Sequence, residues 1–199
     1  LYAVAGEPHS LYLKTKGEGE DLVHAAASRG LVVTSFRPSV IFGAGDSFFN
    51  RFATLLKLSR PLFPLACPDS RFAPVYVNDV TEAICRSLDE ATGGERLDLC
   101  GPEIYTLKEL VTYTREQLEL CCMIVGLGDG LSRLQARMLG VMPVKPFSMD
   151  NYYSLQQDSV CSENALPTLG ITPTPIAAVV PGYLANRTTR GHYDRFRRE

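Results

Sequence analysis

Helix-compatible segments alternate with short runs of apolar, β-branched residues along this chain, and this alternation restricts its fold more than any other feature. The stretch Tyr12–Ser28 is compatible with a helix and ends before Gly30, which suits the left-handed position beyond a helix end. Leu31–Phe36 is typical of a strand buried on both faces of a parallel sheet, and Pro38 closes it. The pattern predicts an α/β fold with a mostly parallel sheet.

The first helical segment offers several apolar residues for a buried face. These residues are Leu13, Leu22, Val23, Ala26 and Ala27. Further helices are expected over 47–59, from Asn78 or Asp79 to 88, and over 106–118, 131–139 and 176–184, with strands over 74–77, 96–100 and 120–125.

Two of these helices carry sequence signals for their first residues. Asp79 precedes Glu82 by three positions and Thr106 precedes Glu109 by three, the spacing of a capping box. The proline-rich connection Pro61–Pro68 is not expected to hold regular structure for long. The remaining stretch, 149–166, is assigned to a smaller lobe.

Charge and composition exclude several classes of function. A formal net charge of -2 argues against general binding of nucleic acid or of anionic membranes, since both require a basic excess. Every apolar run is far shorter than the roughly 20 residues of a membrane-spanning helix. The histidines lack the spacing of metal ligands, so no metal site is expected. The six cysteines form no CxxC pair, which favours free thiols in a reducing cytoplasm.

Tyr12 and Lys16 are the candidate catalytic pair. Residues four apart in a helix lie one turn apart on the same face. A nearby ammonium lowers the pKa of a tyrosine, so that the phenol can act as general acid or base toward a carbonyl or alcohol, while the lysine can hold a ribose hydroxyl. The alternative is a surface tyrosine stacked on a lysine stem.

The context of this pair resembles a known family. Ser10–Lys16, a helix with Glu18 and Glu20, a strand, and then Arg37–Gly43 resemble the middle of extended short-chain dehydrogenases/reductases. In that family the helix carries Tyr-x-x-x-Lys, and an Arg-Pro-x-x-x-x-Gly turn approaches the nicotinamide. The resemblance implies NAD or NADP as cofactor, bound by Tyr12 and Lys16.

The turn itself supplies further implied contacts to the nicotinamide, at Pro38, Ser39, Val40 and Ile41. Gly43 suits a close approach of backbone to a ligand. An ordinary strand-to-helix turn is the alternative for this segment.

Substrate contacts are implied at two positions. The run 71–80 resembles the family segment in which a short strand enters a helix. This resemblance implies that Arg71 contacts substrate phosphates; the alternative is a surface ion pair. Asp79 is expected to cap the helix. Phe42 either lines a substrate pocket or belongs to the core.

The later runs 147–158 and 169–175 resemble the atypical branch that contains the nucleotide-binding accessory subunit of respiratory complex I and epimerase/dehydratase-like proteins. Two functions follow from this resemblance. One is an NAD(P)-dependent oxidoreductase or epimerase/dehydratase-like protein acting on an unidentified small molecule. The other is a non-catalytic NAD(P)H-binding accessory or assembly subunit of a respiratory complex. The expected location is cytoplasmic, or peripheral to the inner membrane in the second case.

The resemblance also implies that part of the site lies outside the sequence. The Gly-x-x-Gly-x-x-Gly turn is absent, and the catalytic serine is expected upstream of Leu1. The expected architecture is the carboxyl-terminal part of a Rossmann-like, doubly wound parallel sheet over 1–118, a substrate-side or partner lobe over 119–186 and a basic tail over 187–199. Exposed sheet edges and apolar faces predict self-association.

Overall fold

The computed structural model describes residues 10–89, 92–141 and 147–184. The strands are β1 (Ser35–Pro38), β2 (Ile41–Phe42), β3 (Leu62–Leu65), β4 (Arg71–Phe72), β5 (Val75–Tyr76), β6 (Arg96–Leu99), β7 (Tyr105–Thr106) and β8 (Met123–Gly126). The helices are α1 (Leu11–Ala25), the 3-10 helix η1 (Ala26–Arg29), α2 (Phe49–Leu58), α3 (Val77–Asp89), α4 (Leu107–Gln117), α5 (Asp129–Gly140), α6 (Met149–Leu155), α7 (Ala165–Thr168) and α8 (Ile176–Leu184).

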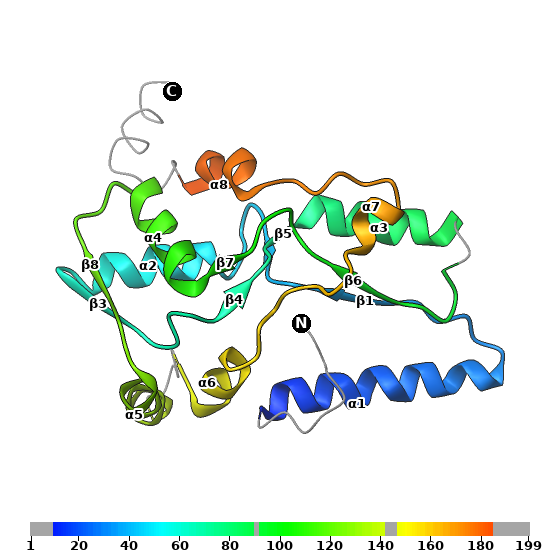
Figure 1. The fold of residues 1–199 in the computed structure, drawn as a ribbon, viewed down its shortest axis with the longest axis horizontal. Helices are drawn as coiled ribbons and strands as arrows, with labels where there is room; N and C mark the ends of the chain where they lie inside the picture. The colour runs from blue at the N-terminus through cyan, green and yellow to red at the C-terminus, as the bar shows by residue number, and fades with distance from the viewer. Residues whose placement is uncertain (1–9, 90–91, 142–146, 185–199) are drawn as a thin grey trace.

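Parallel strand pairing dominates the described sheets, as the alternation predicts. β1 pairs with β6, β2 with β5 and β3 with β8, all in parallel, whereas β4 and β7 form an antiparallel pair. Figure 1 shows α1 on one side of the β1–β6 pair and α3 with α7 on the other. The α/β class with helices on both faces of parallel strands is therefore confirmed.

Buried side chains form three clusters. The largest joins α2, α4 and α8 with β3 and includes Phe42, Phe49 and Leu110. A second cluster lies between α3, β6 and α7, around Leu99. A third joins α5 and α6 around Tyr152. Residues from 119 onward contribute to all three clusters, since α8, α7 and α6 each belong to a different cluster. The domain boundary expected near residue 118 stays a prediction.

Several expected helix ends are confirmed. Thr106 and Glu109 form both halves of a capping box at the start of α4. Gly30 follows η1 in the left-handed conformation, with φ 89°. These local signals identify helix ends because their partners lie within one turn.

The strand expected over Leu31–Phe36 starts later than predicted. Leu31 and Val32 are exposed, and β1 begins at Ser35. The register pairs Ser35 with Arg96, the first residue of β6, and just before it the Gly94 amide donates to the Val33 carbonyl at 2.7 Å. Among the described residues, no backbone hydrogen bond extends this pairing back to Leu31 or Val32, so both lie outside the ladder.

The predicted buried face of α1 is largely wrong. Leu13 is buried, but Leu22 and Val23 are exposed, and Ala26 and Ala27 in η1 are only half-buried. The apolar spacing identified the helix correctly but not which of its faces is buried. Polar contacts near the two ends of α1, and not an apolar face, hold this helix to the rest of the chain.

Two further expectations need correction. Asp79 lies in the first turn of α3, and its carboxylate accepts hydrogen bonds from the Thr174 amide (2.7 Å) and hydroxyl (3.0 Å), so it ties α3 to the segment before α8. Glu82 instead pairs with Arg86. The proline-rich connection contains β3, whose Pro64 is tolerated because β3 has a ladder on one side only.

The cysteines are not all free. Cys100 and Cys161 form a disulfide, whereas Cys67, Cys85, Cys121 and Cys122 are free thiols. Asn164 bonds both backbone groups of Cys100, at 3.2 and 2.8 Å, and this places the later segment beside the end of β6. A separation of 61 residues leaves no spacing signal for such a pair.

None of the helices in the described ranges is long and apolar enough to cross a membrane. The expected basic tail, 187–199, lies outside the described residues.

Candidate functional site

Helix α1 brings Tyr12 and Lys16 together. The Lys16 Nζ lies 5.8 Å from the centroid of the Tyr12 ring, and both side chains are exposed. Among the described residues, neither the Tyr12 hydroxyl nor the Lys16 ammonium has a hydrogen-bond or ion-pair partner, whereas Lys14 pairs with Glu18 at 3.9 Å. The pair thus offers two donors that no described residue engages.

The amino-terminal end of α1 is held by a carboxylate far away in the sequence. Asp150, in α6, accepts hydrogen bonds from the Leu11 amide (2.7 Å), the Ser10 hydroxyl (3.1 Å) and the Tyr12 amide (3.4 Å). Ser10 is fully buried, also contacts Ser154 at 2.7 Å and caps the helix through the Leu13 amide. A negative charge at this end stabilises the helix through its free amides and its dipole. Asp150 therefore fixes the turn that carries Tyr12.

The other end of α1 is tied to the β1–β6 pair by charges. The Arg37 guanidinium binds both carboxylate oxygens of Glu20 at 2.8 to 3.0 Å, and Arg96 binds Asp21 at 2.6 Å. Burial alone would raise the pKa of Glu20, but the hydrogen bonds and charge of Arg37, together with the charge of Arg96, outweigh it and lower that pKa. Glu20 is therefore held as a carboxylate.

The turn after β1 is organised by the buried hydroxyl of Ser39. This hydroxyl donates to the Ser159 carbonyl at 2.6 Å and accepts from the Ala73 amide at 3.2 Å. The Ser39 amide donates to the Leu99 carbonyl at 2.9 Å. The Ser39 side chain is thus engaged within the protein, and its predicted contact with a nicotinamide stays a prediction.

The other residues of the turn differ in exposure. Pro38 and Val40 are half-buried and Ile41 is exposed, while Phe42 is completely enclosed. The Phe42 ring packs against Phe49 and Tyr76 with centroids 6.3 and 5.5 Å away. In this structure Phe42 supports the turn from the core side, the alternative left open by the sequence, and does not face outward.

Gly43 is required by close packing inside the protein. A Cβ built at Gly43 would lie 2.7 Å from Val77 Cγ1, so a side chain there would force Val77 to move. The same turn is fastened by Asp46, whose carboxylate accepts from the Tyr183 hydroxyl at 2.5 Å. Contacts within the protein therefore restrain the shape of the turn.

Arg71 is an exposed residue of β4. Its amide donates to the Asp158 carboxylate at 3.0 Å and its carbonyl accepts from the Ser159 amide at 2.8 Å. No carboxylate of the described residues forms an ion pair with its guanidinium, so the predicted surface ion pair is not found there. Its contact with substrate stays a prediction.

One segment contacts every part of the predicted site. Residues 149–159, here called the bridging segment, supply Asp150 to α1, Asp158 to the Arg71 amide and Ser159 to Ser39. Asp150, Asp158 and Ser159 are not among the residues that the sequence predicts for the site. Their only signal was that they lie in or beside the run 147–158 that carries the family resemblance.

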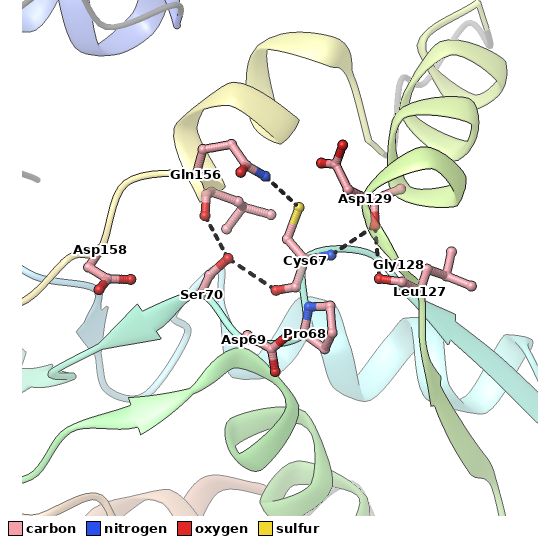
Figure 2. A pocket seen from close by; sticks show the side chains of 11 residues that line it. Cys67, Pro68, Asp69, Ser70, Leu127, Gly128, Asp129, Gln156 and Asp158 are labelled. Atoms are coloured by element: carbon pink, nitrogen blue, oxygen red, sulfur yellow. Dashed lines mark hydrogen bonds between the residues drawn. The ribbon is translucent and has the colours of Figure 1, made fainter.

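A cavity of about 300 Å³ lies beside the bridging segment, where the turn after β3 meets the start of α5 (Figure 2). None of the residues predicted for the site lines it. Its lining residues are Cys67, Pro68, Asp69, Ser70, Leu127, Gly128, Asp129, Ser132, Leu155, Gln156 and Asp158.

The thiol in this cavity is unsuited to nucleophilic chemistry. Figure 2 shows the Gln156 amide directed at the Cys67 sulfur, 3.5 Å away. Burial raises the pKa of the Cys67 thiol, which therefore stays protonated at neutral pH. Within the described ranges, no three His, Cys, Asp or Glu side chains are grouped to hold a metal ion.

Comparison with known proteins identifies the family of the chain. Residues 3–105, more than half of the chain, match the model of the 3-beta hydroxysteroid dehydrogenase/isomerase family. The mitochondrial NADH dehydrogenase [ubiquinone] 1 alpha subcomplex subunit 9 of Mus musculus is 28% identical, over 82% of this chain and 44% of the relative. Its counterpart in Arabidopsis thaliana is 26% identical, over 79% and 41%. The chain thus spans less than half the length of these relatives.

A solved structure shows the same fold. The NADPH-dependent quinone oxidoreductase of Escherichia coli, complexed with NADPH, superposes with a TM-score of 0.68 at 19% identity, over 94% of this chain and 63% of the other. At this identity the likeness shows the fold alone, and it confirms the Rossmann-like class. Because the family model matches the chain from the segment before α1 to β7, the chain belongs to the 3-beta hydroxysteroid dehydrogenase/isomerase family.

Proposed function

We propose that this chain forms the nicotinamide side of an NAD- or NADP-binding site, with Tyr12 as the acid/base group and Lys16 as the contact to the nicotinamide ribose. The observation that carries the proposal is the Tyr12–Lys16 pair, whose two donor groups lie together on α1 and have no partner in the described structure. The family match and the NADPH complexed with the similar oxidoreductase support the same cofactor class.

The residues present fit such a cofactor. Lys16 carries three N–H donors and Tyr12 one O–H donor, which suit the hydroxyls of a ribose. A bound nicotinamide would supply hydride transfer. The role of Tyr12 would be to give a proton to, or take one from, the oxygen of a carbonyl or alcohol.

The contacts of α1 support this assignment because catalytic groups need a fixed position. Asp150 holds the first turn, and the Glu20–Arg37 pair holds the helix against β1. Ile41 is exposed and belongs to the turn proposed to approach the nicotinamide, together with Pro38, Ser39 and Val40. Arg71 is proposed to contact a phosphate or carboxylate of an unidentified small-molecule substrate.

A second candidate is a non-catalytic NAD(P)H-binding accessory subunit of a respiratory NADH:quinone oxidoreductase. The specific observation in its favour is that both mitochondrial relatives are named as subunits of NADH dehydrogenase. In that case the protein would be peripheral to the inner membrane through its complex. A cytoplasmic location and self-association stay predictions.

Calorimetric titration with NADPH and with NADH tests the proposal. The chain, a Lys16→Ala variant and a Lys14→Ala variant are compared, because Lys14 lies on the same helix and is engaged by Glu18. We expect binding by the chain and by Lys14→Ala, and a loss of at least about tenfold in affinity for Lys16→Ala, the scale of one charge-assisted contact. Absence of binding, or equal losses in both variants, would contradict the proposal.

A Tyr12→Phe variant separates the two candidates. The substitution removes one hydroxyl and keeps the ring. For an enzyme we expect cofactor binding to persist while reduction of a carbonyl test substrate stops. For an accessory subunit we expect the unsubstituted protein to bind the cofactor and to reduce none of the carbonyl substrates tested. Both forms are prepared as the full-length protein, because this chain spans less than half the length of its curated relatives.

A further inference from the structure

Helix α5 exposes a row of large apolar side chains. Leu131, Leu134 and Met138 lie on the helix and Val141 continues it at the carboxyl-terminal cap, where the backbone is still helical. Their exposed fractions are between 52% and 87%. These four residues are called the α5 stripe.

The buried side of α5 is made of small residues. Ser132 and Ala136 are buried, and the Ser132 hydroxyl accepts from the Cys67 amide at 3.2 Å and donates to the Leu127 carbonyl at 3.2 Å. A surface helix ordinarily buries its large apolar residues and exposes polar ones. In α5 this order is reversed, so the α5 stripe leaves apolar area in water at a cost that a partner would remove.

The spacing of the α5 stripe indicates the shape of that partner. Positions 131, 134, 138 and 141 follow the i, i+3, i+7, i+10 order of a and d positions in a heptad. Such a row is narrower than the face with which a helix covers a globular core and matches the seam by which two helices pack. The geometry therefore favours a helix as the occupant.

The β3–β8 pair near α5 also carries exposed apolar side chains. The Gln135 amide donates to the Pro64 carbonyl at 3.1 Å, and this places α5 next to the β3–β8 pair. On that pair Leu62 and Met123 are exposed and lie opposite each other in the register.

The charge at the edge of the stripe indicates the chemistry of the partner. Arg133 is engaged within the chain, by Asp129 at 3.1 Å and by the Tyr152 hydroxyl at 2.9 Å. Arg137 borders the stripe one turn later, is exposed, and has no ion pair with any described residue. A carboxylate on the partner helix would complement it.

A second copy of this chain fits less well than a different protein. The acidic residue of α5 is Asp129, which Arg133 already engages. Two copies meeting through their α5 stripes would therefore bring arginines to the seam without a free α5 carboxylate to pair with Arg137. The stripe calls for a partner that carries its own acidic residue.

We propose that the α5 stripe is the docking site for an amphipathic helix of a partner protein, with an apolar a/d seam and an acidic residue opposite Arg137. This inference does not depend on dinucleotide binding. The affinity of an isolated helix is expected to be modest, because the stripe covers only three turns.

The test uses two labelled three-heptad peptides with leucine at every a and d position. One has glutamate and the other lysine at every e and g position. Fluorescence anisotropy measures their binding to the full chain. We expect the acidic peptide to bind about fivefold more tightly, the size of exchanging one exposed attraction for one repulsion. Arg137→Glu should reverse that preference.

Leu134→Asp should abolish peptide binding, whereas the matched Leu22→Asp on the exposed face of α1 should not. Circular dichroism of both variants verifies folding. Equal binding of the two peptides, or binding that survives Leu134→Asp, overturns the proposal. Two further results would also overturn the proposal, provided that neither peptide binds. One is binding of the chain to phosphatidylglycerol vesicles that Leu134→Asp removes. The other is dimer formation, measured by sedimentation, that the same substitution removes.

Discussion

Helix α1, of 15 residues, and helix α4, of 11, are attached to the protein in different ways. Helix α4 buries Leu107, Leu110, Val111 and Thr114 in the largest apolar cluster. Helix α1 buries only Leu13 along its length and is held by Asp150 at one end and by the Glu20–Arg37 pair at the other. The helix that carries the proposed chemistry is thus the one with less apolar packing.

The difference separates stability from position. Apolar burial contributes most of the folding free energy but is not directional. Hydrogen bonds to charged groups contribute less, yet they fix angles and respond to pH. We infer that the α4 side stabilises the fold, whereas the polar contacts of α1 set where Tyr12 and Lys16 lie.

The largest expected effect comes from opening the apolar cluster. Leu110→Ala should lower the free energy of unfolding by about 2 to 5 kcal/mol, because Leu110 is fully buried and its loss leaves a cavity. Leu22→Ala, in α1, should change it by less than about 0.5 kcal/mol, since that side chain is 73% exposed. Urea unfolding measures both. Similar losses in the two variants would erase the distinction between the helices.

A smaller and more local effect is expected from Asp150→Asn. The variant keeps the shape of the side chain but weakens the bonds to the first amides of α1, and we expect a loss of about 1 kcal/mol. Hydrogen exchange should accelerate at α1 and stay unchanged at α4. Glu18→Gln, an exposed carboxylate on α1, serves as the control. Equal acceleration in both helices would mean that α1 is not an independently held element.

The smallest effect concerns acid pH. The pKa of Glu20 is lower in the folded protein than its ordinary value of 4.5, so its contribution to stability is present above that pH and is lost as the pH falls through the lowered value. Glu20→Gln should therefore make stability fall less steeply below about pH 4.5. Unfolding midpoints between pH 3 and 6 measure this. An unchanged slope would show that the Arg37 pair does not hold α1.

Local signals in the sequence predicted much of the fold. The capping box of α4 and the glycine after η1 act within one turn, and both are confirmed. The alternation of periods predicted the parallel α/β class, because it reflects which faces of an element are buried. The Tyr12–Lys16 contact follows directly from helical spacing.

Long-range partners could not be predicted in the same way. Ser10 is recognisable as a residue type that begins helices, but nothing near it indicates that Asp150 completes the cap. The first residue of β1 depends on the position of β6, and the Cys100–Cys161 bond depends on where Asn164 places its segment. Each of these features is a property of two distant segments meeting.

The bridging segment also has a consequence for how the protein is made. Ser10 and Asp150 are separated by 140 residues, and Ser39 and Ser159 by 120. At the usual rates of translation, the ribosome needs roughly six to thirty seconds to synthesise the intervening chain. Throughout that interval the nascent α1 lacks the Asp150 carboxylate and the Ser39 hydroxyl lacks its acceptor. We expect nascent chains that end before Asp150 to leave α1 open to protease, and α1 to become protected only once the bridging segment has left the ribosome.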